Sequence, residues 1–101
     1  MSNFVRVAAA SDLGPGQCKT VQADGRELAL YNVGGVYYAT DNVCLHRGGP
    51  LGEGSLDGKI VTCPWHGWTY DVATGVCPIN PSVAVKTYPV KVEGNDVQVE
   101  I

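Results

Sequence analysis

Two short segments of this chain each pair one cysteine with one histidine: Cys44–His46, which reads Cys-Leu-His, and Cys63–His66, which reads Cys-Pro-Trp-His. Together they contain both of the chain's 2 histidines. Thiolate and imidazole groups are ligands of transition metals, whereas calcium and magnesium prefer oxygen ligands. We therefore predict that the two segments come together in the fold as the two arms of a metal centre, with the ligands Cys44, His46, Cys63 and His66.

The distribution of these ligands between the two arms separates two kinds of site. A zinc finger usually places two cysteines in one arm and two histidines in the other. Here each arm supplies one of each, which suits two metal ions, one holding both thiolates and one holding both imidazoles. A mononuclear zinc site with mixed arms remains the alternative.

Glycines and prolines flank both arms. Arg47–Gly52 reads Arg-Gly-Gly-Pro-Leu-Gly after the first arm, and Gly67 follows the second. Glycine allows the backbone to approach inorganic sulfide closely and to present N–H groups to it, and Pro50 and Pro64 stiffen the loops. Such fixed donors favour the more negative, reduced state of a cluster and so raise its potential.

These two arms, with Asp71 and Gly75 after them, resemble the Rieske proteins, and the likeness extends from the early strands to Val92. The resemblance implies one 2Fe–2S cluster per chain. It also implies that Cys44 and Cys63 bind the buried iron, and that His46 and His66 bind the outer iron.

Departures from the Rieske pattern indicate which members of the family this chain resembles. The respiratory members have a cysteine in each loop, joined as a disulfide, where this chain has Gly49 and Trp65. They also have an N-terminal membrane helix, which we do not expect here. High-potential members place a serine and a tyrosine at the positions of Trp68 and Tyr70, and we hypothesise that Tyr70 raises the potential. The alternative is an ordinary strand aromatic with its hydroxyl group in water.

The remaining pattern is that of an all-β fold. Period-two runs and glycine turns predict strands over 4–8, 18–22, 27–33, 36–40, 59–62, 68–72, 85–92 and 97–101, with tight turns at Asp24-Gly25 and Gly34-Gly35. We also expect one helical turn near Ser11–Leu13, capped by Ser11. The predicted architecture is a Rieske-like antiparallel β-sandwich or barrel. A cluster-binding subdomain, formed by about residues 42–70, is inserted into this sandwich or barrel.

Composition limits the function classes. With 101 residues the chain predicts a single domain, 1–101, and a net charge of −3 argues against nucleic-acid binding. No apolar stretch is long enough to cross a membrane and no leader is visible, so we expect a cytoplasmic monomer. Cys18 and Cys77 are interpreted as ordinary free or half-buried thiols.

The resemblance predicts a soluble one-electron carrier, the ferredoxin of an aromatic-ring dioxygenase system, between a flavin-dependent reductase and a terminal oxygenase. It is not expected to turn over a substrate, because both histidines are already used. The alternatives are a small subunit of a larger reductase, such as an NAD(P)H-dependent nitrite reductase, and a structural zinc module. The expected docking surface surrounds His46 and His66 and includes Leu45, Arg47, Pro50, Leu51, Trp65 and Pro78.

Overall fold

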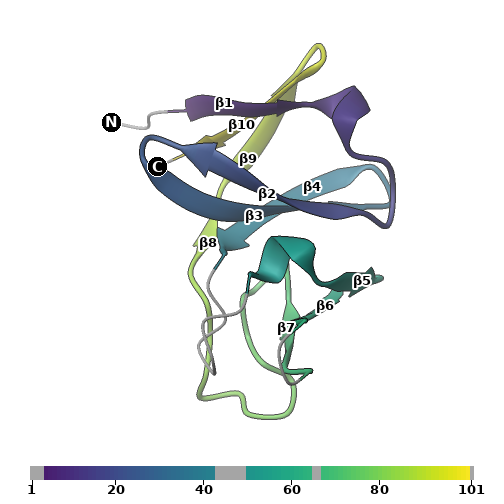
Figure 1. Cartoon of the computed structure of the whole chain (residues 1–101), viewed down its shortest axis with the longest axis vertical. Coiled ribbons are helices and arrows are strands. Elements are labelled where there is room, and N and C mark those ends of the chain that lie inside the picture. Colours follow the sequence, from purple (N-terminus) through teal and green to yellow (C-terminus); the bar gives the residue numbers. More distant parts are fainter. Residues whose placement is uncertain (1–3, 43–49, 65–66, 101) are drawn as a thin grey trace.

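The computed structural model describes residues 4–42, 50–64 and 67–100. Its strands form three antiparallel sheets, stacked along the long axis of the molecule (Figure 1). The first has the order β1-β10-β9, the second β2-β3-β4-β8 and the third β5-β6-β7. Their bounds are β1 Phe4–Ala9, β2 Cys18–Ala23, β3 Arg26–Val33, β4 Val36–Asp41, β5 Ser55–Asp57, β6 Ile60–Thr62, β7 Thr69–Asp71, β8 Thr87–Tyr88, β9 Val90–Glu93 and β10 Asp96–Glu100.

Strand β3 lies between two hydrophobic cores. Leu28 and Leu30 belong to the core shared with the first sheet, whereas Ala29 and Tyr31 belong to the core shared with the third. All four residues are fully buried. Because successive side chains of a strand point to opposite faces, a continuous apolar run such as Leu-Ala-Leu-Tyr suits a strand that is covered on both sides.

The two predicted hairpin turns are confirmed. Asp24 and Gly25 have φ values of 51° and 80°, and they join β2 to β3. Gly34 and Gly35, with φ values of 58° and 98°, join β3 to β4. Two consecutive residues with positive φ match the right-handed twist of the flanking strands, which is why Asp-Gly and Gly-Gly favour such turns.

The third sheet and the 3₁₀ helix η2 (Leu51–Glu53) lie between β4 and β8 in the chain, and they form the lower layer in Figure 1. The all-β sandwich with an inserted sheet is therefore confirmed. Residues 59–62 and 68–72 were expected as strands, and β6 and β7 lie within them. Strand β5 was not predicted, because its three residues carry no usable alternation.

Two details of the sequence prediction are wrong. The expected strand 85–92 is divided into β8, which pairs with β4, and β9, which pairs with β10. Pro89 lies between them, and because it has no N–H to donate, the chain changes sheets there. The helical turn is η1 (Ala10–Asp12), and Ser11 lies inside it; the Asp12 carboxylate instead accepts the N–H of Ala9 at 3.2 Å.

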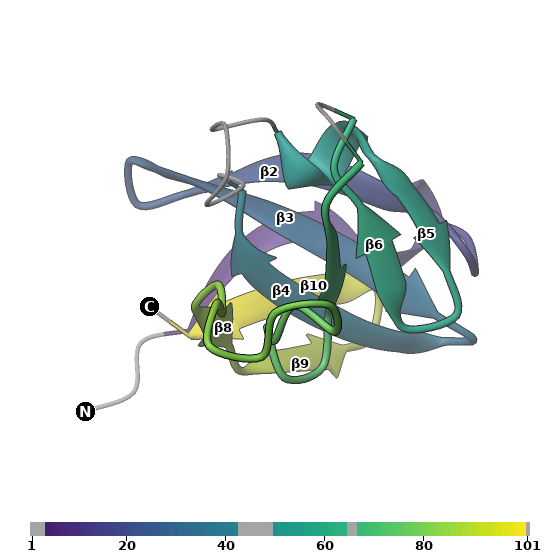
Figure 2. The same cartoon turned by 90° about the horizontal axis from the view of Figure 1, so that it is seen from below.

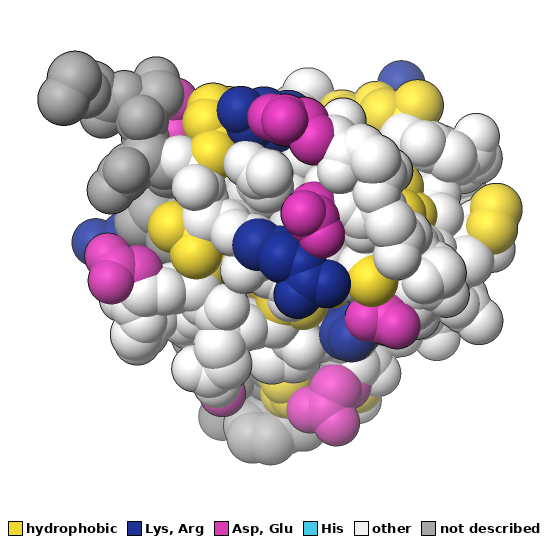
Figure 3. Space-filling model, turned by 90° about the horizontal axis from the view of Figure 1, so that it is seen from above, with side chains coloured by type: hydrophobic (Ala, Val, Ile, Leu, Met, Phe, Trp, Pro, Cys, Tyr) yellow, Lys and Arg dark blue, Asp and Glu magenta, His cyan; other side chains and the backbone are white. Residues whose placement is uncertain are grey.

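The face over the first sheet, at the end of the molecule opposite the third sheet, carries charges of both signs side by side (Figure 3). Arg6 pairs with Asp96 at 2.7 Å, and Lys91 pairs with Glu93 at 2.9 Å. Within the described parts of the chain, no helix has the length and apolar character needed to cross a membrane.

Candidate metal centre

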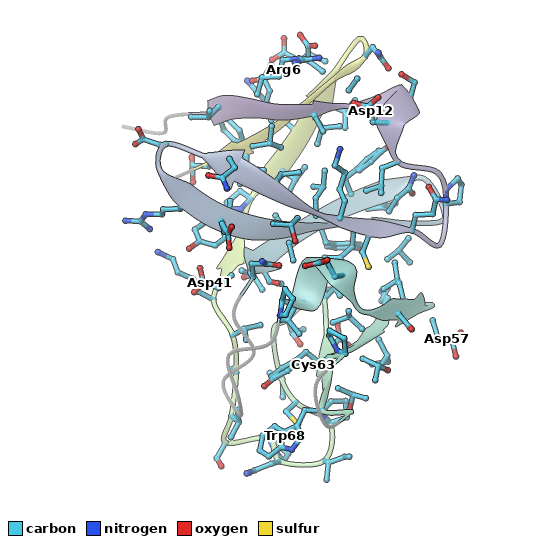
Figure 4. All side chains as sticks on the ribbon, in the orientation of Figure 1. Arg6, Asp12, Asp41, Asp57, Cys63 and Trp68 are labelled. Carbon is cyan, nitrogen blue, oxygen red and sulfur yellow. The ribbon has the colours of Figure 1, made fainter. Side chains whose placement is uncertain are left out.

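Cys63 is the predicted ligand that the structure describes. It directly follows β6, and its exposed fraction is 1%. Its backbone N–H donates to the carbonyl oxygen of Trp68 at 2.7 Å, which closes the turn between β6 and β7. Gly67, with φ +74°, allows the chain to reverse there without strain. Figure 4 shows Cys63 inside the lower part of the molecule and Trp68 nearer its end. A thiol is thus held in a dry, hydrogen-bonded turn.

Tyr70 lies on β7, opposite Val61 of β6, and is fully buried. It belongs to the same hydrophobic cluster as Cys63. The interpretation of Tyr70 as a strand aromatic with its hydroxyl group in water is therefore wrong. A buried phenol hydroxyl is costly unless it is hydrogen-bonded, so its place beside the cysteine turn fits a role in tuning the site.

The described residues on either side of the first arm lie close together. The chain leaves β4 at Asp41 and re-enters the described structure at Pro50, before η2. The N–H of Leu51 donates to the carbonyl oxygen of Asn42 at 2.7 Å. Both predicted arms therefore begin and end at points joined by a short backbone hydrogen bond.

The other three predicted ligands, Cys44, His46 and His66, lie outside the described residues. Among the residues that the structure does describe, no group of three or more potential metal ligands is assembled. Cys63 fits an iron–sulfur centre in its donor chemistry, its burial and its closed turn, since low dielectric and backbone N–H groups near the sulfur tune such centres.

The other two described cysteines behave as ordinary thiols, as predicted. Cys77 is buried at 2% exposure in the cluster that contains Cys63, and Cys18 is half-buried. Neither forms a disulfide. The Cys18 thiol donates to the carbonyl oxygen of Gly54 at 3.3 Å, and burial raises its pKa. A raised pKa favours the protonated form of the Cys18 thiol.

The expected docking surface is only partly supported. Leu51 has an exposed fraction of 0%, so the prediction that it contacts a partner is wrong; it packs in the same cluster as Cys63. Pro50 is half-exposed and Pro78 exposed, while Leu45, Arg47 and Trp65 lie outside the described residues.

Ile79 was missed as a surface candidate, although 82% of it is exposed. It stands in the irregular segment between β7 and β8, which lies at the same end of the molecule as the β6–β7 turn (Figures 1 and 2). The available signal was an isoleucine between two prolines, Pro78 and Pro81. Because the segment has no alternation of apolar and polar residues, its sequence could not show whether Ile79 is buried or exposed. Ile79 helps to line a pocket with Gly67, Trp68, Thr69, Cys77 and Asn80.

Comparison with known proteins gives a consistent family. The model of the Rieske [2Fe-2S] domain matches residues 3–89. The ferredoxin component of the naphthalene 1,2-dioxygenase/salicylate 5-hydroxylase systems of Ralstonia sp is 38% identical over 100 residues, covering 98% of this chain and 96% of that protein. The ferredoxin component of the naphthalene 1,2-dioxygenase system of Pseudomonas putida is 39% identical, with coverages of 97% and 95%.

Solved structures agree with these relatives. The ferredoxin of Sphingomonas yanoikuyae B1 superimposes with a TM-score of 0.87 at 35% identity, covering 98% of this chain and 99% of that one. A chain from the complex of reduced oxygenase and oxidized ferredoxin in carbazole 1,9a-dioxygenase gives a TM-score of 0.86 at 38% identity, with coverages of 96% and 92%.

Proposed function

This chain belongs to the Rieske [2Fe-2S] domain family and carries a 2Fe–2S cluster, and we propose that it transfers single electrons from a flavin-dependent reductase to the terminal oxygenase of an aromatic-ring dioxygenase system. The observation that carries the proposal is Cys63, a buried thiol in a turn closed by its own N–H. The ferredoxin components among its relatives, matched over nearly their whole length, support the same role.

We assign the ligands as Cys44, His46, Cys63 and His66. When bound, the cluster accepts and releases one electron. The residues of the chain supply the environment. Cys63 would bind iron from a buried position, and the turn that ends at Trp68 holds its backbone in place. The third sheet, inserted between β4 and β8, holds the second arm at one end of the molecule (Figure 4). We place the exit for the electron at that end, through the proposed ligands His46 and His66.

A carrier has to bind two partners in turn and leave each quickly. We propose a free monomer in the cytoplasm, with residues 42–70 as a cluster-binding part of a single domain. Pro78 and Ile79 would extend the docking surface around the histidines. A small, partly apolar contact suits weak and fast encounters. Since the chain holds no histidine beyond the two assigned ligands, we propose that it does not transform a substrate by itself.

The test starts with the purified protein. We expect iron and acid-labile sulfide in equal amounts, and an electron paramagnetic resonance signal after reduction with dithionite. The reduced protein is then mixed anaerobically, in a stopped-flow instrument, with the oxidised terminal oxygenase of a naphthalene 1,2-dioxygenase system. We expect the oxygenase to reoxidise it within the time that the instrument records. Zinc in place of iron would overturn the proposal. A cluster-loaded chain that purifies in a stable larger reductase and reduces no oxygenase would favour the role of a reductase subunit.

A further inference from the structure

Asn42 is a buried polar residue at the point where the first arm leaves β4, and its exposed fraction is 3%. Its carbonyl oxygen accepts the N–H of Leu51 at 2.7 Å. Its side-chain Oδ1 accepts the N–H of Gly52 at 2.8 Å and the hydroxyl of Thr20 at 3.3 Å. Asn42, which precedes the first arm, is thus hydrogen-bonded to Leu51 and Gly52, which follow the arm, and to Thr20 of β2.

The backbone at Gly52 lies directly against β2. A Cβ atom on Gly52 would come within 2.6 Å of the Thr20 Oγ1 atom, so only glycine fits there. Between Thr20 and β4 stands Ala29 of β3, which pairs with both Thr20 and Thr40 and carries only a methyl group. The end of the first arm therefore rests on the second sheet, and the Asn42 amide oxygen lies at the junction of β2, β4 and η2.

We propose that Asn42 is a positioning residue for the metal centre: it holds the two ends of the segment 43–50 together and so presets the first arm for cluster binding. This inference rests on the proposed function, because it takes Cys44 and His46, which follow Asn42 in the chain, as ligands. Asn42 acts through the backbone of the arm and is not itself a ligand.

The physical reason is the conformational entropy of the arm. A loop whose ends are already joined loses less entropy when its ligands are fixed, so the bound cluster is held more tightly. A fixed arm would also hold its backbone N–H groups in place around a bound cluster, and fixed donors of this kind favour the reduced state. Without the Asn42 side chain the buried N–H of Gly52 and the half-buried hydroxyl of Thr20 would lose their acceptor, which adds to the cost.

Asn32 offers a matched control, because it is buried to the same 3% and its Oδ1 also accepts a backbone N–H, that of Gly35, at 2.8 Å. Its Nδ2 donates to the carbonyl oxygen of Leu13 at 2.8 Å. These hydrogen bonds stabilise the β3–β4 turn and the loop after η1, and neither of them reaches an arm. Loss of Asn32 should therefore destabilise the fold without acting on the cluster.

The experiment compares Asn42→Ala with Asn32→Ala in the cluster-loaded protein. Three quantities are measured: the melting temperature by far-ultraviolet circular dichroism, the rate of cluster release to an iron chelator well below that temperature, and the midpoint potential. We expect both variants to melt earlier than wild type. Both variants lose two side-chain hydrogen bonds, but only those of Asn42 reach the end of the first arm and β2. Only Asn42→Ala should therefore release the cluster at least about tenfold faster, and only it should have a lower potential.

Two further variants keep the test decisive if Asn42→Ala does not fold. Asn42→Asp retains an oxygen that accepts the Gly52 N–H and should release the cluster at nearly the wild-type rate. Thr20→Val removes one of the two donors and should give an intermediate rate. The proposal is overturned if Asn42→Ala matches wild type in release and potential, or if Asn32→Ala changes both to the same extent. A wild-type protein without iron and sulfide would overturn the proposed function itself. A cluster-loaded Asn42→Ala protein with wild-type release and potential is a different result, which overturns only the role of Asn42.

Discussion

Cys63 and Trp68 are joined by a backbone hydrogen bond of 2.7 Å, which makes the second arm a closed turn at the end of the β6–β7 hairpin. The same distance joins Leu51 to Asn42 across the first arm. The described residues at the base of each arm are therefore joined by a backbone hydrogen bond next to the sheets. Substitutions at the site and substitutions in the sheets should therefore differ in their effects on the cluster and on the stability of the fold.

The two buried cysteines should differ in their effect on the cluster. Cys63→Ala should abolish the retention of iron and sulfide, because it removes one of the four proposed ligands. Cys77→Ala is the matched control, since Cys77 is buried to 2% in the same hydrophobic cluster. It should keep the cluster and lose only about 1 kcal/mol of stability through the small cavity. Iron and sulfide analysis of both variants checks this, and a Cys63→Ala protein with a full cluster would contradict the ligand assignment.

Tyr70→Phe should lower the midpoint potential by about 40 mV, if its hydroxyl stabilises the reduced state by about 1 kcal/mol. Tyr31→Phe is the control. Tyr31 is equally buried in the same cluster, but its hydroxyl is hydrogen-bonded to the Thr40 hydroxyl at 2.8 Å. Protein-film voltammetry should show a shift in the first variant and none in the second. Equal potentials for Tyr70→Phe and wild type would remove Tyr70 from the factors that set the potential.

Ile79→Ser should weaken docking and leave the cluster unchanged. The side chain is 82% exposed at the end of the molecule that carries the second arm, and its burial by a partner would contribute roughly tenfold in affinity. In a reconstituted dioxygenase system the KM for the carrier should rise by about that factor, with an unaltered potential. Val92→Ser, on the first sheet, replaces a residue that is 43% exposed and should change neither quantity. An unchanged KM for Ile79→Ser would show that the partner binds elsewhere.

Gly75→Ala should destabilise the fold far more than Gly94→Ala. Both glycines have positive φ, +81° and +60°, so each alanine costs about 1 kcal/mol of backbone strain. A Cβ atom on Gly75 would also collide with the carbonyl oxygen of Val85, whereas nothing lies within 4 Å of one on Gly94. We expect a further loss of about 1–3 kcal/mol at Gly75 from this overpacking. Denaturant unfolding compares the two, and equal losses would show that the loop after β7 yields easily.

Alkaline pH should destabilise the protein through Tyr31. Burial is the main reason why the pKa of Tyr31 is raised above its usual value near 10. The neutral phenol is therefore compatible with folding at neutral pH, but above about pH 10 the unfolded chain ionises first and stability falls. In Tyr31→Phe this slope should be shallower by up to about 1.4 kcal/mol per pH unit. Unfolding curves between pH 8 and 11 measure the slope, and identical slopes would contradict the assignment.

The local pattern was sufficient for much of the fold. The turns at Asp24-Gly25 and Gly34-Gly35 could be predicted because positive φ is a local requirement. The short strands could not. Ser55–Asp57 forms β5 by pairing with the neighbouring strand β6, where Leu56 faces Val61, and three residues are too few for a recognisable alternation. The division of 85–92 depends on which sheet each half joins, and the pairing of Thr87 with Thr40 is long-range, so local preference says little about it.

The sequence by itself determined the chemistry of this protein. The types and spacing of the proposed ligands Cys44, His46, Cys63 and His66 indicated the family, because the donor atoms that a metal prefers are supplied by particular residue types. Only the tertiary structure decided which neighbours surround the site. It buries Leu51, which looked like a docking residue, exposes Ile79, which did not, and places Asn42 between Gly52 and Thr20. Burial and hydrogen-bond partners depend on which distant strands meet, and that is settled by the packing of the sheets rather than by any local pattern.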